Sequence, residues 1–190
     1  MASKKLAILA SGAGSNARNI INYFRGRSDV SIVLVASNKK EAGVLQIAES
    51  EGIPTYILNK QNFSESDEFL QHLKSLEVDM IILAGFLKKV PAKITREFDK
   101  RMINIHPALL PSYGGHGMYG HFVHEAVHQN GEKESGITIH YVNEHYDEGD
   151  IIFQAKVSLT PEDTPQTIEQ KVRALEITHF PQVINQLVKG

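Results

Sequence analysis

The chain has 190 residues, with 20 Lys and Arg against 22 Asp and Glu and a formal net charge of −2. This length indicates one domain or two small ones, and the absence of cysteine excludes disulfides and cysteine-ligated metal centres. The near-neutral charge disfavours a dedicated nucleic-acid or membrane-surface binder. Because no signal-peptide pattern or spanning apolar run is found, we expect a cytoplasmic protein that contacts neither membrane nor nucleic acid.

Short apolar runs alternate with longer amphipathic segments along the first half of the chain. The apolar runs predict buried parallel strands at Leu6–Ala10, Val30–Ala36, Thr55–Leu58, Met80–Ala84 and Met102–Ile105. The amphipathic segments predict helices at Asn16–Arg25, Ala42–Glu51, Ser64–Leu76 and Ala92–Phe98. Ser64 and Asp67 resemble a capping box at the start of the third helix. This order predicts an α/β fold with a doubly wound, mostly parallel, Rossmann-like sheet.

A glycine-bearing loop, S-G-A-G-S-N, follows the first predicted strand and opens the first helix. Gly12, Ala13, Gly14, Ser15 and Asn16 would surround an anion with backbone N–H groups and polar side chains, which predicts a phosphate site. A turn that merely needs glycine is the alternative. NAD is disfavoured because the second strand ends in S-N-K-K, without the carboxylate that would bind the ribose. A 2′-phosphorylated dinucleotide stays open.

The fifth predicted strand ends in N-I-H-P, at the sheet edge where α/β proteins bind ligands. Alternation places Asn104 and His106 on one side of this strand. Asp147 lies in a turn before a later strand and can reach the same edge. The amide and the imidazole would stabilise an oxyanion, and the carboxylate would raise the pKa of the histidine. This set suits acyl transfer, and the alternative is a capped strand end with a surface aspartate.

The second half of the chain is less regular than the first. The pattern predicts a loop at Pro107–Gly120, a helix at about His121–His128, and antiparallel strands at Ile137–Val142 and Ile151–Val157 that extend the sheet. A last helix begins with Thr164 as N-cap and Pro165 at its first position, and Pro181 is expected to break or kink it. We expect a single domain over residues 1–190, with a phosphate-binding half at 1–100 and a catalytic half at 101–190.

The H-E-x-x-H motif formed by His124, Glu125 and His128 raises the alternative of a zinc hydrolase. Two features oppose it. The position of a third metzincin histidine holds Glu134, and all 4 methionines precede Gly131, so a downstream Met-turn is missing. We therefore expect exposed helix histidines and no metal.

The segment N-I-H-P-A-L-L-P at 104–111, followed by D-E-G-D-I at 147–151, resembles the family of formyltransferases that use 10-formyltetrahydrofolate. The early S-G-A-G-S-N, the strand L-A-G-F at 83–86 and the length resemble the branch that formylates glycinamide ribonucleotide in purine synthesis. The resemblance runs from about Lys4 to Leu187. It implies glycinamide ribonucleotide and the co-substrate 10-formyltetrahydrofolate as small-molecule partners, in a monomer or homodimer.

The resemblance also implies roles for individual residues. Asn104, His106 and Asp147 would be catalytic, Gly12 to Asn16 would hold the nucleotide phosphate, and Glu176 would contact its ribose or amine. The folate side would be lined by Leu87, Lys88, Lys89, Val90, His140 and Asn143. His121 would match a family histidine if the loop before it is gapped. The sequence departs from the family at Ala13, commonly Asn, and near Ser66, where an arginine that assists the phosphate is missing.

Three other functions remain as alternatives. One is another formyltransferase, or a deformylating hydrolase, that uses the same catalytic residues. Another is a non-catalytic nucleotide-binding module that uses the glycine loop alone. The last is the zinc hydrolase, which would leave the first half of the chain without a purpose.

Overall fold

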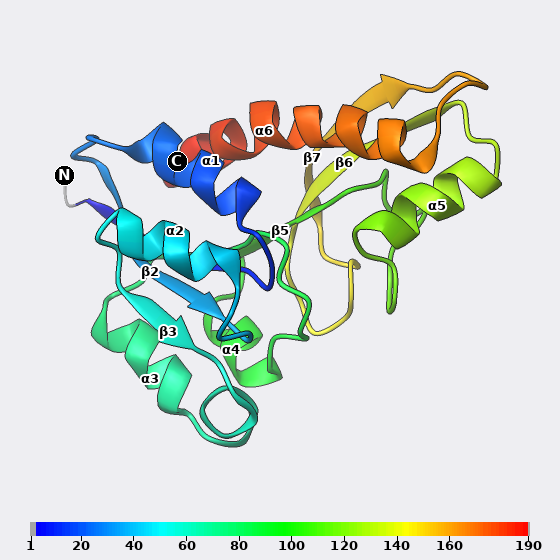
Figure 1. The fold of residues 1–190 in the computed structure, drawn as a ribbon. Helices are drawn as coiled ribbons and strands as arrows, with labels where there is room; N and C mark the ends of the chain where they lie inside the picture. The colour runs from blue at the N-terminus through cyan, green and yellow to red at the C-terminus, as the bar shows by residue number, and fades with distance from the viewer. Residues whose placement is uncertain (1–2, 190) are drawn as a thin grey trace.

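The structure is a computed structural model, and it describes residues 3–189. A seven-stranded sheet runs through the molecule (Figure 1). Its strands are β1 (Lys4–Leu9), β2 (Val30–Ser37), β3 (Thr55–Ile57), β4 (Met80–Leu83), β5 (Met102–His106), β6 (Glu134–Tyr141) and β7 (Ile151–Ser158). They lie in the order β3-β2-β1-β4-β5-β6-β7. Strands β1 to β5 are parallel, and β6 is antiparallel to both of its neighbours, β5 and β7. The predicted fold class is confirmed.

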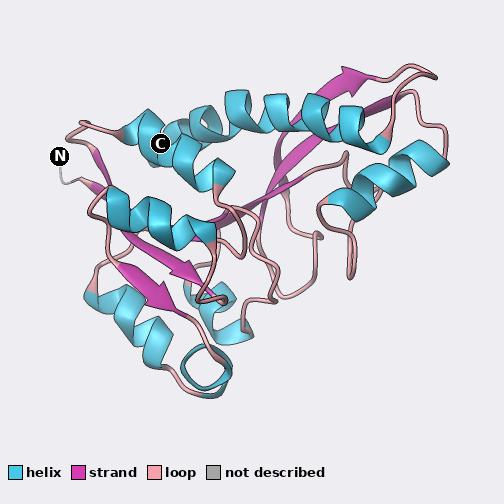
Figure 2. Ribbon diagram, in the orientation of Figure 1, coloured by secondary structure: helices cyan, strands magenta, loops and turns pink. Residues whose placement is uncertain are grey.

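Helices cover both faces of this sheet (Figure 2). They are α1 (Ser15–Phe24), α2 (Gly43–Ser50), α3 (Glu68–Ser75), α4 (Ala92–Glu97), α5 (His121–Gln129) and α6 (Pro165–Lys189). Alternate residues of β1 point to opposite faces, so Leu6 and Ile8 pack in the core beneath α1, α2, α5 and α6. Ala7 and Leu9 pack in the second core, beneath α3 and α4. The apolar runs of the sequence are continuous because these strands are buried on both sides.

The strand order reverses between β1 and β4, which makes this pair the topological switch point of the sheet. The chain leaves β1 toward β2 and β3 on one side, and continues from β4 to β5 on the other. The loops that follow β1 and β4 therefore separate and leave a crevice between them. This crevice is where the fold positions a ligand site.

Several local predictions need correction. The predicted capping box of Ser64 and Asp67 is wrong, because a π-helical turn covers Lys60–Glu65 and the side chains of Asn59 and Asn62 form the box there. Asp67 is the N-cap of α3 without a side-chain hydrogen bond. The final helix continues through Pro181 instead of ending there, and β6 begins at Glu134 instead of Ile137. No helix within residues 3–189 is long and apolar enough to cross a membrane.

Candidate active site

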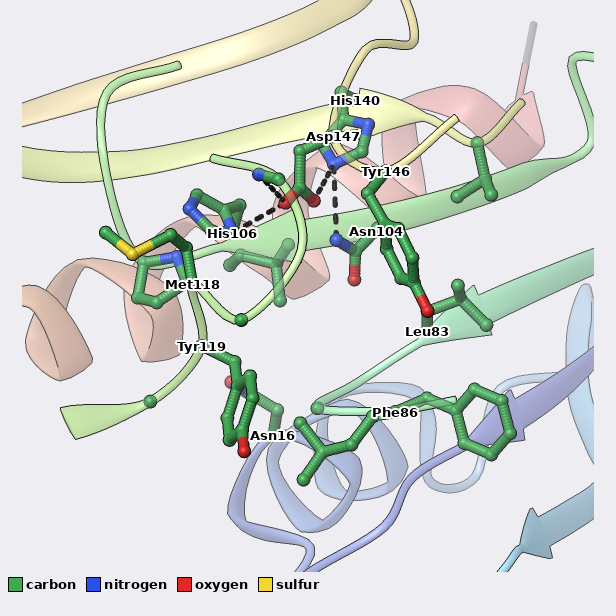
Figure 3. Close-up of a pocket in the computed structure, with 18 of the residues that line it drawn as sticks. Asn16, Leu83, Phe86, Asn104, His106, Met118, Tyr119, His140, Tyr146 and Asp147 are labelled. Atoms are coloured by element: carbon green, nitrogen blue, oxygen red, sulfur yellow. Dashed lines mark hydrogen bonds and ion pairs between the residues drawn. The ribbon is translucent and has the colours of Figure 1, made fainter. Parts of the chain in front are cut away.

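A cavity of about 760 Å³ opens at the carboxyl ends of β1, β4 and β5. Its wall combines the first turn of α1, the segments that follow β4 and β5, the loop before α5 and one face of α6. Figure 3 shows Asn16, Phe86, Asn104 and Asp147 around this space, although they come from distant parts of the sequence. Because it lies at the switch point of the sheet, this cavity is the candidate active site.

The glycine loop joins β1 to α1 beside the cavity. Ser15 and Asn16 line it, whereas Gly12 and Ala13 are exposed and Gly14 is buried. Gly14 provides no side-chain cap for α1, and no acidic residue lies in the first turn of this helix. The uncapped N–H groups and the positive end of the helix dipole favour an anion here.

Two residues of this loop have structural duties of their own. Gly14 has a left-handed backbone with φ 81°, and a Cβ atom there would lie 2.7 Å from Val44 Cα, so glycine allows α1 and α2 to approach closely. The buried Ser11 hydroxyl donates to Asn38 Oδ1 at 2.5 Å and accepts from the Leu87 N–H at 2.9 Å. Asn38 thus ties the end of β2 to this loop, near the place where NAD-binding folds carry a carboxylate.

Glu176 lies on α6 against the first turn of α1. Its carboxylate accepts a hydrogen bond from Asn16 Nδ2 at 2.9 Å, and burial raises its pKa above the usual value. Arg173, on the same face of α6, lines the cavity and opposes this rise in the pKa of Glu176. Arg173 was not predicted from the sequence, although its position three residues before Glu176 places it on the same helix face. Arg173 therefore places a positive charge at the cavity, which the sequence does not provide near Ser66.

β5 places Asn104 and His106 at the cavity, as alternation predicts (Figure 3). Antiparallel pairing of β5 with β6 sets Asn104 directly opposite His140. The Nδ1 atom of His140 lies 2.8 Å from the Tyr141 carbonyl oxygen, which only accepts, so Nδ1 carries the proton. In the neutral ring, Nε2 then accepts a hydrogen bond from Asn104 Nδ2 at 3.2 Å, and the second N–H of this amide stays free for a ligand.

Asp147 reaches the same point from the turn before β7 (Figure 3). Its Oδ2 accepts the Gly115 N–H at 3.0 Å and lies 3.6 Å from His106 Nδ1, while Oδ1 lies 3.5 Å from His140 Nε2. Burial by itself would raise the pKa of Asp147, but His140, His106 and the Gly115 N–H together lower it below its usual value. Asp147 is therefore an ionised carboxylate beside two imidazoles.

His106 is buried, with a side chain 4% exposed. Burial lowers its pKa and outweighs Asp147 and the Tyr113 carbonyl, which raise it, while His140 lowers it further. The expectation that Asp147 raises the pKa of His106 above its ordinary value is therefore wrong in its net direction, because burial disfavours the charged ring. At neutral pH the imidazole is neutral and able to accept a proton.

Asn104, His106 and Asp147 together can stabilise the charges that develop when a nucleophile attacks a carbonyl group. The amide of Asn104 can donate to a developing oxyanion, and the imidazole of His106 can take up a proton. The carboxylate of Asp147 can then stabilise the resulting imidazolium. Such an arrangement is suited to attack by a neutral nucleophile on a carbonyl carbon.

The residues expected on the folate side all line the same cavity, and they are Leu87, Lys88, Lys89, Val90, His140 and Asn143. The two lysines are exposed, whereas Val90 is buried in the core beneath α4. The Asn143 side chain accepts the His145 N–H at 2.8 Å and so orders the turn beside the cavity. Tyr119 and Tyr146 also line the cavity (Figure 3). Neither was predicted, because irregular loops carry no periodic signal in the sequence.

The H-E-x-x-H motif lies on α5, and its residues face different ways. His124 is buried and lines the cavity, and its Nδ1 has no hydrogen-bond partner, so the expectation of an exposed histidine is wrong here. Glu125 and His128 are exposed, and His128 lines a separate cavity of about 260 Å³. Among residues 3–189, no three His, Asp or Glu side chains are grouped so that they could hold a metal ion.

Comparison with known proteins gives consistent matches over nearly the whole chain. A family model described as formyl transferase matches residues 4–184. The phosphoribosylglycinamide formyltransferase of Haemophilus influenzae is 38% identical, over 98% of this chain and 88% of its own length. The chloroplastic phosphoribosylglycinamide formyltransferase of Arabidopsis thaliana is 42% identical over 97% of this chain. The chain spans 65% of that plant protein and 61% of its counterpart from Vigna unguiculata.

Solved structures agree with these sequence matches. The crystal structure of phosphoribosylglycinamide formyltransferase from Anaplasma phagocytophilum has a TM-score of 0.89 at 34% identity, covering 98% of this chain and 87% of that one. The corresponding structure from Brucella melitensis has a TM-score of 0.88 at 33% identity and covers 99% and 97% of the two chains. From its fold, its cavity and these matches, the chain belongs to the formyl transferase family.

Proposed function

We propose that this chain transfers the formyl group of 10-formyltetrahydrofolate to the amine of glycinamide ribonucleotide. The observation that carries this proposal is the convergence of Asn104, His106 and Asp147 in one cavity that also receives the uncapped start of α1. A phosphate site and an acyl-transfer site in one space suit a phosphorylated substrate with a reactive amine. The names of the relatives agree with this assignment.

The nucleotide would bind with its phosphate at the glycine loop. Gly12 to Asn16 present the N–H groups and two polar side chains, and Arg173 adds a positive charge from α6 in place of the missing arginine. Glu176, held by Asn16, would accept hydrogen bonds from the ribose hydroxyls. This placement directs the amine toward β5, where Asn104 and His106 lie.

The reaction begins when the amine nitrogen attacks the formyl carbon. A new N–C bond forms, the carbonyl π electrons move to oxygen, and an alkoxide results. The free N–H of Asn104 donates to this oxygen, and the neutral His106 takes the proton that the attacking amine loses. Asp147 stabilises the imidazolium that forms, which compensates for the burial of the ring.

The second step releases the folate. The alkoxide reforms the carbonyl, the bond from the formyl carbon to N10 of the folate breaks, and N10 receives the proton held by His106. The histidine is then neutral again, and the proton balance closes without a metal ion. The folate would lie along residues 87–90 with His140 and Asn143, where backbone groups beside exposed lysines suit a planar ring with an anionic tail.

Formyl transfer assays test this proposal directly. Purified protein is mixed with 10-formyltetrahydrofolate, with and without glycinamide ribonucleotide, and tetrahydrofolate release is followed by absorbance. We expect release that depends on the nucleotide. Release at the same rate without nucleotide would support the deformylating hydrolase instead, and binding of the nucleotide without release would support the non-catalytic module. The single-domain organisation, the cytoplasmic location and the choice between monomer and homodimer stay predictions.

A further inference from the structure

The loop between β5 and α5 contacts two of the proposed catalytic side chains through its backbone. The carbonyl oxygen of Tyr113 lies 2.7 Å from Nε2 of His106, and the N–H of Gly115 donates to Asp147 Oδ2 at 3.0 Å. A carbonyl oxygen only accepts hydrogen bonds, so the Nε2 atom of His106 must carry a hydrogen. In the neutral ring, Nδ1 is then the bare nitrogen, and it lies 3.6 Å from Asp147.

The conformation of Tyr113 explains why its carbonyl points at His106. Its φ of 58° is left-handed, which is uncommon for a residue other than glycine. The half-buried ring packs against the main core. Its hydroxyl donates to Glu132 Oε1 at 2.6 Å and accepts from Asn130 Nδ2 at 2.8 Å, beyond the end of α5. Packing and these two bonds keep the backbone in a conformation that it would otherwise leave.

We infer that Tyr113 is a positioning residue that commits Nε2 of His106 to a backbone carbonyl and makes Nδ1 the nitrogen that exchanges the proton. This inference rests on the proposed function for the identity of the reacting amine. The proton lost by the amine passes to Nδ1, and from there to N10 of the folate, while the Nε2 hydrogen stays on Tyr113. Asp147, beside Nδ1, is then correctly placed to stabilise the cation.

The separation between Nδ1 and Asp147 fits this role. At 3.6 Å it exceeds a hydrogen bond, so Nδ1 is near the carboxylate without being occupied by it. Two other titratable groups surround the ring: His140 lowers the pKa of His106, and His106 in turn lowers the pKa of His124. Asp147 is thus the one negative group among those named that favours a proton on this ring.

Nitrogen-15 NMR of the ligand-free protein tests the inference first. Correlation spectra of the ring nitrogens identify which nitrogen of His106 is protonated, with His106→Gln used for assignment. We expect a single Nε2–H tautomer with a slowly exchanging proton in the wild-type protein. In Tyr113→Ala, which removes the ring and both hydroxyl bonds, this proton should exchange rapidly and the two tautomers should mix. Tyr113→Phe should give an intermediate result.

Kinetics test whether this positioning matters for turnover. We expect kcat to fall about 10-fold in Tyr113→Ala and less in Tyr113→Phe, with KM for both substrates changed less than about 2-fold. Tyr56→Phe is the matched control, because the Tyr56 hydroxyl donates to Glu68 at 2.7 Å away from the cavity. Glu132→Gln keeps an acceptor for the Tyr113 hydroxyl and should restore most of the turnover lost in Glu132→Ala.

Several results would overturn the inference. A wild-type His106 protonated at Nδ1 alone would do so, as would a Tyr113→Ala protein with an unchanged Nε2–H signal. A loss confined to KM would instead place Tyr113 in substrate binding. The NMR measurement needs no substrate, so failure of the proposed function, seen as absent formyl transfer by the wild-type protein, is distinguishable from failure of this inference.

Discussion

At the scale of the residue, each reacting group is held by a neighbour that determines what it can do. His140 accepts a hydrogen bond from one N–H of the Asn104 amide, and the second N–H stays available for a ligand. Burial raises the pKa of Asp147, but the Gly115 N–H and attraction to the protonated forms of His140 and His106 lower it below its usual value. Since Asn104, His106 and Asp147 act on one charge in one step, their contributions should not be additive.

Asn104→Ala should lower kcat by about 10²–10³-fold, because one hydrogen bond to the oxyanion is lost. Asn19→Ala is the control, since the Asn19 amide donates to the Ile177 carbonyl at 2.7 Å and does not line the cavity. The double variant Asn104→Ala with Asp147→Asn should lose less than the product of the two single effects. Steady-state kinetics of the two single variants, the double variant and the control measure these effects, and a multiplicative loss would contradict a shared transition state.

The protonation of His106 gives a second prediction at this scale. Burial lowers its pKa below the usual value of about 6.5, and Asp147 opposes that shift, while His140 adds to it. Asp147→Asn removes the opposing charge, so the pKa of His106 should fall further. NMR titration of the ring measures both values. A pKa that rises in the variant would refute the proposed balance of burial and charge.

The positions of Asn104 and His106 could be predicted from the sequence, but their hydrogen bonds and pKa shifts could not. Alternation along β5 was sufficient to place Asn104 and His106 on one side. Pairing of Asn104 with His140 depends on the register of β5 against β6, which local sequence does not specify across a long connection. The direction of the pKa shift at His106 required knowing its burial, and an adjacent carboxylate suggested the opposite sign.

At the scale of the element, the start of α1 both packs and offers an anion site. Gly14→Ala should destabilise the protein by about 1–3 kcal/mol, because the added Cβ meets Val44 at 2.7 Å with an unfavourable φ. Gly12→Ala is the matched control, since no heavy atom lies within 4 Å of its added Cβ. Chemical denaturation gives both free energies of unfolding. Equal stability of the two variants would contradict the close packing of α1 on α2.

Strands were easier to predict than helix ends. All of β4 and most of β1 are buried, continuous apolar runs, so their positions follow from the sequence pattern. The predicted start of α3 at Ser64 was wrong. Asn59 and Asn62 cap each other across a π-helical turn, and a capping pattern at Ser64 does not reveal this arrangement. Pro181 lies inside α6 because its neighbours are buried against the sheet, which outweighs the lost backbone bond.

At the scale of the whole molecule, the switch point between β1 and β4 brings a phosphate site and an acyl-transfer site into one cavity. The amide, imidazole and carboxylate there complete the proton balance, so exhaustive chelation should leave kcat within about 2-fold of its untreated value. Activity measured before and after chelation, with and without added zinc, checks this. Activity lost on chelation and restored by zinc would return attention to His124 and its motif.

The most direct test of the account follows the formyl carbon itself. The protein is incubated with glycinamide ribonucleotide and 10-formyltetrahydrofolate labelled with ¹³C in the formyl group, and the products are analysed by mass spectrometry and NMR. We expect the label to appear as an amide on the nucleotide, in an amount equal to the tetrahydrofolate released, and we expect Asn104→Ala to slow its appearance. Label recovered as formate, with the nucleotide unchanged, would contradict it.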